Sequence, residues 1–194
     1  MSNTIIEDGT GKGFLAMVDS TNKLEVRSVA IPSRSSAVQL EEGFEIGALP
    51  VAFTGTSETA LIYFKNNGPT IILDIWEFSG AESTGGTSDV CLLKLYQLPT
   101  GITNGTPGGA VNSRFGSSKS LKVDVEIGNG STSAVSGGSL FGGSYIKYVG
   151  QAVFEGPWVL PQGQSVALTV TPPASNTSMP LGVRIRCHIQ QGDD

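Results

Sequence analysis

Alternation of apolar and polar residues recurs along the chain, and it restricts the fold more than any other feature. The clearest case is residues 181–190, LGVRIRCHIQ, where every second side chain is apolar. Residues 120–128, SLKVDVEIG, repeat the pattern. Because successive side chains of a β-strand point to opposite faces, a period of two predicts strands with one buried face.

Further runs of this kind are separated by short stretches rich in glycine, serine, threonine and asparagine. The predicted strands cover residues 24–31, 44–53, 58–66, 70–78, 88–98, 120–128, 165–173 and 181–190. Pro50 interrupts the second strand, which indicates an edge strand or a bulge, since proline cannot donate to a sheet. So many strands with turn-rich links predict an all-β fold, an antiparallel β-sandwich or a closed barrel.

Residues 61–78, LIYFKNNGPTIILDIWEF, contain two apolar-rich runs joined by Asn66, Asn67, Gly68 and Pro69. The join is short enough for two strands to lie side by side. We therefore expect these runs to form a β-hairpin of two core strands.

Two segments differ from the strand pattern. Residues 1–36 end in the polar stretch PSRSSA and have few aromatic residues with which to build a core. We predict an extended N-terminal arm with a short β-hairpin of residues 13–18 and 23–31, followed by a sandwich domain over residues 37–194. Residues 99–118 show almost no periodicity and predict a long loop, which inside a compact domain is usually functional or mobile.

The composition argues against nucleic-acid and membrane partners. Charged residues make up 15% of the chain and the formal net charge is −5, which gives no attraction to anionic polymers or lipids. No run approaches the ~18 apolar residues of a membrane span. The first residues also lack the basic and apolar regions of a signal peptide. We expect a soluble protein that is made in a cytoplasm.

Residue types that perform catalysis do not gather in the sequence. His188 is the only histidine, and it shares the polar side of its strand with Arg184 and Arg186. A catalytic triad would need a serine and an aspartate from elsewhere in the chain. Glu41 and Glu42 are adjacent, so on a strand they would point in opposite directions and could not act as an acid–base pair. The sequence predicts a protein that is not an enzyme.

The two cysteines, Cys91 and Cys187, lie far apart and both fall in apolar runs. No Cys-x-x-Cys motif or Cys/His cluster accompanies them, which argues against a zinc site. We expect both thiols to be buried and free, with a disulfide between them as the alternative. No residue pattern indicates a cofactor or a metal.

Four stretches resemble head-surface proteins of tailed bacteriophages, in particular jelly-roll cement (decoration) proteins. They are ETALIYFKNNGPTIILDIWEF, VCLLKLYQLPTGITNGT, VNSRFGSSKSLKVDVEIG and WVLPQGQSVALTVTPP. The opening IIEDGTGKGFLAMVDSTNKLEVRSV resembles the N-terminal arm of such proteins. The resemblance implies a jelly roll, often a homotrimer, on the outside of the virion capsid. It would bridge neighbouring major capsid protein subunits, although a head-fibre or tail component shares the same patterns.

An arm that cannot build its own core suits burial against a partner, for example by strand addition. The candidate partner contacts in the arm and on the last strand are Phe14, Leu15, Met17, Leu24, Val26, Arg27, Arg184 and Arg186. The two arginines on the last strand could dock an acidic partner, or they could belong to a solvated strand face.

Carbohydrate or receptor binding is the alternative function. Trp76 and Trp158 are the two tryptophans of the chain and could stack on a sugar, with help from the loop at residues 99–118. Each could equally fill the core of a sandwich. An enzyme of the cupin type would need a cluster of metal-binding histidines, which one histidine cannot supply.

Overall fold

The computed structural model describes residues 17–18, 24–25, 37–80, 90–147, 150–174 and 178–190. The chain divides into two units, residues 1–32 and 33–194. In the first unit, β1 (Met17–Val18) pairs antiparallel with β2 (Leu24–Glu25). This pair lies within the predicted hairpin of residues 13–18 and 23–31, and the rest of that hairpin falls outside the described residues.

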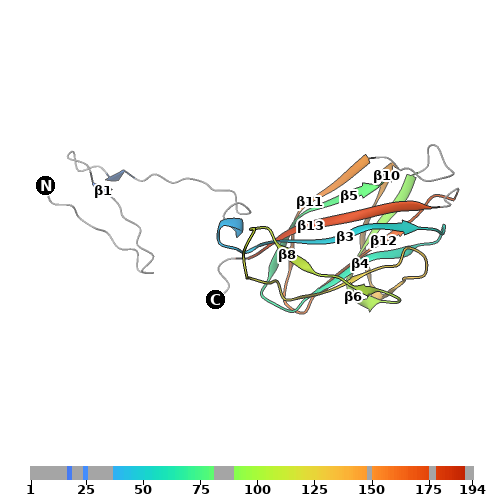
Figure 1. The fold of residues 1–194 in the computed structure, drawn as a ribbon, viewed down its shortest axis with the longest axis horizontal. Helices are drawn as coiled ribbons and strands as arrows, with labels where there is room; N and C mark the ends of the chain where they lie inside the picture. The colour runs from blue at the N-terminus through green and yellow to red at the C-terminus, as the bar shows by residue number, and fades with distance from the viewer. Residues whose placement is uncertain are drawn as a thin grey trace. The chain divides into compact units, whose positions relative to one another are not determined.

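The second unit is a sandwich of two antiparallel sheets, which confirms the predicted all-β sandwich (Figure 1). One sheet has six strands in the order β10-β6-β12-β4-β9-β7, and the other has five in the order β11-β5-β13-β3-β8. The strands are β3 (Gly43–Phe53), β4 (Thr59–Asn66), β5 (Ile71–Gly80), β6 (Val90–Ile102), β7 (Thr106–Pro107), β8 (Ala110–Asn112), β9 (Val123–Ile127), β10 (Val135–Lys147), β11 (Gly150–Leu160), β12 (Ser165–Thr171) and β13 (Met179–Ile189).

The core lies between the sheets and is built from the alternating apolar positions. On β13, Leu181, Val183, Ile185 and Cys187 are all buried, as the sequence pattern predicts. The largest fully buried side chains include Phe44, Phe53, Phe64, Trp76 and Phe78. Burial of each such side chain contributes about 1.5–3 kcal/mol to folding.

The predicted interruption at Pro50 is confirmed as a bulge. The register between β3 and β13 shifts between Leu181 and Val183, whose partners on β3 are Val51 and Ala48. Pro50 therefore stands in the irregular part of the strand, where its missing N–H interrupts no ladder hydrogen bond.

The predicted hairpin of residues 61–78 is wrong. β4 pairs with β12 and β9, whereas β5 pairs with β11 and β13, so the two runs lie in opposite sheets. Phe64 and Trp76 face each other across the core, with ring centroids 5.9 Å apart. Pro69 explains the error, because a turn starting at Asn66 would need an N–H at residue 69 to close a hairpin. The chain instead crosses from one sheet to the other.

The predicted loop at residues 99–118 contains the end of β6 and two short strands, and it closes one side of the sandwich. β6 continues to Ile102, β7 pairs with β9 at one edge of the six-stranded sheet, and β8 pairs with β3 at one edge of the five-stranded sheet. The segment thus passes from one sheet to the other at this side. At the opposite side, the sheets end in β10 and β11, which do not pair with each other.

Candidate partner-binding surface

The arginines of the predicted polar stripe are paired within the sheet. Arg184 Nε donates to Glu77 Oε2 at 2.8 Å, and Arg186 Nη2 lies 3.0 Å from Glu77 Oε1. Arg186 Nε lies 3.6 Å from Glu45 Oε1. Glu45 and Glu77 come from β3 and β5, the two neighbours of β13, so their charges match those of the arginines. This face therefore supports the solvated-strand interpretation better than docking of an acidic partner.

His188 pairs with Asp74 on β5, where Nδ1 and Oδ2 lie 2.9 Å apart. A triad would also need a hydroxyl or thiol hydrogen-bonded to the ring. Among the described residues, Asp74 is the one side chain bonded to His188. The described residues likewise contain no group of three His, Cys, Asp or Glu side chains placed to hold a metal ion.

Both cysteines are buried thiols, as predicted, and no disulfide joins them. Burial raises the pKa of the Cys91 thiol to about 11. Because the thiolate is the reactive form, a thiol with this pKa is inert at neutral pH. The described part of the chain also contains no helix long and apolar enough to cross a membrane.

Glu58 is the centre of a cluster of side-chain hydrogen bonds on the six-stranded sheet. It accepts hydrogen bonds from Tyr96 Oη at 2.8 Å, from Thr169 Oγ1 at 2.7 Å and from Lys94 Nζ at 2.5 Å. Burial raises the pKa of Glu58, but the bonds from Lys94, Thr169 and Tyr96 outweigh it and hold the pKa below its usual value of 4.5. The ionised carboxylate is thus the form that the fold stabilises.

Replacing Glu58 with glutamine is expected to lower the free energy of unfolding by about 1 kcal/mol near pH 7. A carboxyl whose pKa is lowered by folding stabilises the fold above its unfolded pKa of 4.5, and this contribution is lost as the pH falls through the folded pKa. Urea unfolding of both proteins should therefore show a difference that shrinks as the pH falls below 4.5. A difference that stays constant with pH would contradict this account of the cluster.

The two tryptophans belong to a row of aromatic rings that runs from the core to an open cleft. Trp76 is 1% exposed, and Trp158 on β11 is partly buried against it, with ring centroids 5.7 Å apart. Phe141 on β10 meets Trp158 edge to face at 6.4 Å. Trp76 is therefore a core residue with no face for a sugar, whereas Trp158 and Phe141 stand where the two sheets separate.

The cleft at this side consists of two adjoining hollows of about 240 and 150 Å³. Trp76, Leu95, Phe141 and Trp158 line both hollows. One hollow extends to Leu98, Leu160 and Gln164, and the other extends to Phe78, Leu93 and Gly142–Ser144. We call this feature the β10–β11 cleft. The sequence analysis identified its two tryptophans but missed Phe141 and Leu95 as cleft residues.

Both edge strands that border the cleft pair irregularly with their neighbours in the sheets. The register between β10 and β6 shifts between Leu140 and Gly142, which places Phe141 in a bulge. The register between β11 and β5 shifts between Glu155 and Trp158. Each bulge thus lies beside one ring of the Phe141–Trp158 pair. Bulges of this kind re-aim side chains and discourage pairing of an edge strand with another sheet.

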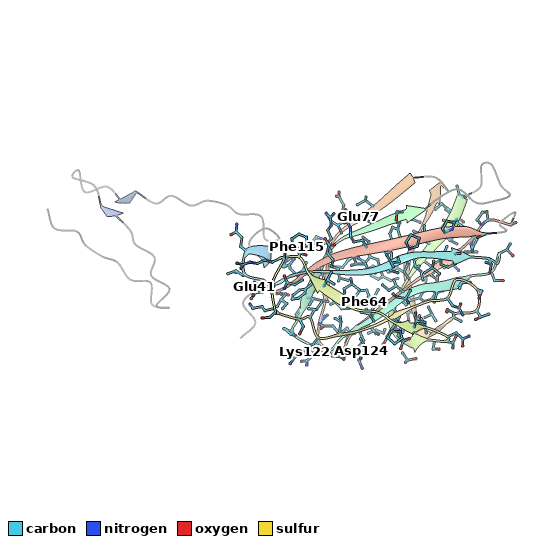
Figure 2. All side chains as sticks on the ribbon, viewed as in Figure 1. Glu41, Phe64, Glu77, Phe115, Lys122 and Asp124 are labelled. Carbon is cyan, nitrogen blue, oxygen red and sulfur yellow. The ribbon has the colours of Figure 1, made fainter. Side chains whose placement is uncertain are left out.

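Another exposed aromatic ring lies at the end of the sandwich that contains residues 37–42. Phe115 is fully exposed, and Figure 2 shows it at the same end as Glu41. Its loop is bonded to that segment, because Arg114 Nη1 lies 3.2 Å from Glu41 Oε1 and donates to the Gln39 carbonyl at 2.9 Å. Ser117 Oγ donates to Glu41 Oε2 at 3.1 Å. The Phe115 ring is exposed, and hydrogen bonds fix its loop to the neighbouring segment. The ring is therefore a candidate partner contact that the sequence did not single out.

The structure describes two of the arm contacts that the sequence predicts. Met17 and Leu24 lie in the paired strands β1 and β2. Phe14, Leu15, Val26 and Arg27 lie outside the described residues. Their role in binding a partner stays a prediction.

Comparison with known proteins does not assign a family or a function to the chain. No protein-family description matches the chain, and no curated protein sequence matches it. The likeness to phage cement proteins therefore stays a prediction from the sequence stretches quoted above.

Proposed function

We propose that the chain is a non-enzymatic structural protein of a tailed-bacteriophage virion, a cement protein on the outer surface of the capsid. In this proposal it bridges neighbouring major capsid protein subunits as a homotrimer and stabilises the shell. A native mass of the free protein near three times 20.1 kDa would support the trimer.

The observation that carries the proposal is the strand order of the sandwich. Apart from β7, β8 and β9, the strands form the orders β3-β13-β5-β11 and β4-β12-β6-β10. The first of these eight strands pairs with the last, the second with the seventh, the third with the sixth and the fourth with the fifth. This nested order supports a jelly roll, a fold that viral capsid proteins, lectins and cupins use.

A fold alone does not fix a function. The capsid role is favoured over a cupin-type enzyme because the chain has one histidine. It is favoured over a lectin because Trp76 is buried in the core. The resemblance of the sequence to cement proteins then gives the capsid as the partner.

Deleting residues 1–36 is expected to abolish binding to capsids while leaving the sandwich folded. Residues 1–32 belong to a different unit from the sandwich, and the sequence of the arm has few aromatic residues with which to build a core. The measurement is co-sedimentation with capsids of the phage that encodes the chain, purified without this protein. Circular dichroism and the unfolding temperature report whether the shortened protein still folds.

A matched control keeps the full chain and replaces only Phe14 and Leu15 with alanine. This variant should bind more weakly than the intact protein and retain its unfolding temperature. An arm-less protein that folds and still pellets with capsids at full affinity would contradict the arm's role.

Glycan binding is the second candidate, and Trp158 is the observation that favours it, since its ring is only partly buried. Binding to a glycan array that disappears in a Trp158→Ala variant would favour this alternative over the capsid role. We expect no glycan signal from the intact protein.

A further inference from the structure

The dipeptide Asn-Gly occurs three times in the chain, at Asn67, Asn104 and Asn129. An asparagine in this dipeptide is open to attack by the main chain, because the following glycine has no Cβ to hinder its own backbone nitrogen. All three asparagines are exposed. Sequence and exposure therefore do not distinguish the three sites, and any difference in reactivity has to come from the hydrogen bonds of the fold.

Deamidation of such a pair is an intramolecular substitution. The backbone nitrogen of the glycine loses its proton and attacks the asparagine Cγ, so that an N–Cγ bond forms, the Cγ–Nδ2 bond breaks and ammonia leaves. Water then opens the five-membered succinimide at one of its two carbonyls, which gives aspartate or isoaspartate. The reaction therefore needs a glycine N–H that no acceptor holds and a side-chain amide that is able to turn toward it.

At Asn67 the attacking nitrogen is held in a hydrogen bond. The N–H of Gly68 donates to Asn66 Oδ1 at 2.9 Å, and both Gly68 and Asn66 are buried. The N–H of Asn67 itself donates to the Lys122 carbonyl at 2.8 Å, which fixes the main chain on the other side of the side chain. Attack from Gly68 would have to break its bond to Asn66 inside the crossing between the sheets.

At Asn129 the side-chain amide is held instead. Its Oδ1 accepts hydrogen bonds from the backbone N–H groups of residues 131–133 at 2.9 to 3.1 Å. Its Nδ2 donates to Thr132 Oγ1 at 2.9 Å. Gly130 is buried, and a Cβ added there would lie 2.2 Å from the Ala52 carbonyl oxygen, so its main chain is packed against β3. Formation of the succinimide would turn the amide out of its hydrogen bonds and move this packed glycine.

Asn104 meets both requirements. Among the described residues its side chain makes one hydrogen bond, from Nδ2 to Thr132 Oγ1 at 3.1 Å, and Thr132 is exposed. The same hydroxyl oxygen also accepts from Asn129, so Asn104 shares its acceptor. The N–H of Gly105 has no acceptor in the part of the chain that the structure describes. The nitrogen is thus available for attack, and a single exposed bond restrains the amide.

We propose that Asn104 is a modification site at which the folded chain deamidates spontaneously, whereas hydrogen bonds protect Asn67 and Asn129. The product carries a carboxyl group in place of the amide. Its isoaspartate form also has one more methylene group in the main chain between β6 and β7, in the segment that closes one side of the sandwich. The proposal depends on the hydrogen bonds around the three asparagines and is independent of the capsid role.

The test is incubation of the full-length protein in mildly alkaline buffer, followed by tryptic digestion and mass spectrometry that distinguishes aspartate from isoaspartate. The three pairs fall in separate tryptic peptides, residues 66–94, 95–114 and 123–147, and a sample digested without incubation gives the background. We expect Asn104 to deamidate roughly ten-fold or more faster than the other two, because reaction there breaks no buried hydrogen bond. Equal rates at the three sites, or a faster reaction at Asn67 or Asn129, would overturn the proposal.

The same incubation in concentrated urea measures the reactivity of the three pairs without the fold. Because the reacting groups are then identical and none of them is held, we expect similar rates at the three sites. A preference for Asn104 in urea as large as that in the folded protein would overturn the assignment, because the local sequence rather than the hydrogen bonds would be its cause.

Two exposed positions in one loop provide matched variants. Thr132→Ala removes the one side-chain bond of Asn104 and should raise its deamidation rate by roughly two- to ten-fold. Ser131→Ala is the control, since Ser131 is exposed and makes no bond to Asn104 among the described residues, and it should leave that rate unchanged. Equal rates at Asn104 in the two variants would contradict the restraint by Thr132.

Asn66→Ala tests the protection of Asn67, because it removes the acceptor of the Gly68 N–H. The deamidation rate at Asn67 should rise by roughly ten-fold. Asn129 in the same sample reports any general loosening of the fold and should change less. A rise at Asn67 no larger than the rise at Asn129 would overturn the protective role of Asn66.

Discussion

Replacing Asn66 with alanine is expected to lower the free energy of unfolding by about 3 kcal/mol. Asn66 has no solvent exposure, and its side chain bonds three backbone groups. Nδ2 donates to the carbonyls of Pro69 at 2.8 Å and Leu160 at 3.0 Å, and Oδ1 accepts from the Gly68 N–H at 2.9 Å. Alanine would leave all three groups without these bonds at the point where the chain crosses between the sheets.

Asn67→Ala is the matched control, since the neighbouring residue has the same side chain in an exposed position. Its replacement should change the free energy of unfolding by less than about 0.5 kcal/mol. Urea unfolding of the three proteins gives the comparison. Equal effects at the two positions would show that the Asn66 bonds do not hold the crossing.

The second large effect is expected for Gly130→Ala, with a loss of about 3–5 kcal/mol. Gly130 has a φ of +75°, which L-residues with a Cβ rarely adopt. An added Cβ would also lie 2.2 Å from the Ala52 carbonyl oxygen, which is a backbone atom of β3 and cannot move aside cheaply. Strain and collision therefore act together at this position.

Gly163→Ala separates the two causes. Gly163 has a similar φ of +80°, but a Cβ added there would meet nothing within 4 Å. This variant should lose only the strain energy of about 1–2 kcal/mol. The difference between the two variants in thermal or urea unfolding measures the collision with β3, and a difference near zero would contradict the close packing of residue 130.

The sequence predicts the interior strands well, because their surroundings are regular. β3, β4, β5, β6, β12 and β13 all overlap runs of the predicted pattern. In these strands one face packs against the core along most of the length. The alternation of apolar residues therefore shows directly which side chains are buried. The burial of both cysteines follows from the same apolar runs, whereas the bulge at Pro50 follows from the missing N–H of proline.

The sequence pattern does not predict the edge strands β10 and β11, because both strands are irregular. β10 contains Gly137, Gly138, Gly142 and Gly143, and its register shifts twice, so no period of two survives. β11 is interrupted by Pro157 within a register shift. Edge strands need such irregularities to avoid pairing with other sheets. The candidate cleft lies between these two strands, so it could not be found from the sequence pattern.

The contacts between strands depend on register, which the sequence does not show. Arg184 and Arg186 form a basic stripe in the sequence, but Glu77 and Glu45 on neighbouring strands meet them in the fold. The distinction between a hairpin and a crossing at residues 66–69 likewise depends on which strands pair. Local patterns predict that strands exist, whereas the surface that they present follows from their order in the sheets.

In the proposed role the protein stabilises a capsid by bridging its subunits, and binding to capsids alone does not test this role. The most direct measurement is the temperature at which DNA-filled capsids release their DNA, with and without saturating amounts of this protein. We expect a higher release temperature with the bound protein, and no change when the protein lacks residues 1–36. Saturated binding of the intact protein without any rise in the release temperature would contradict the claim.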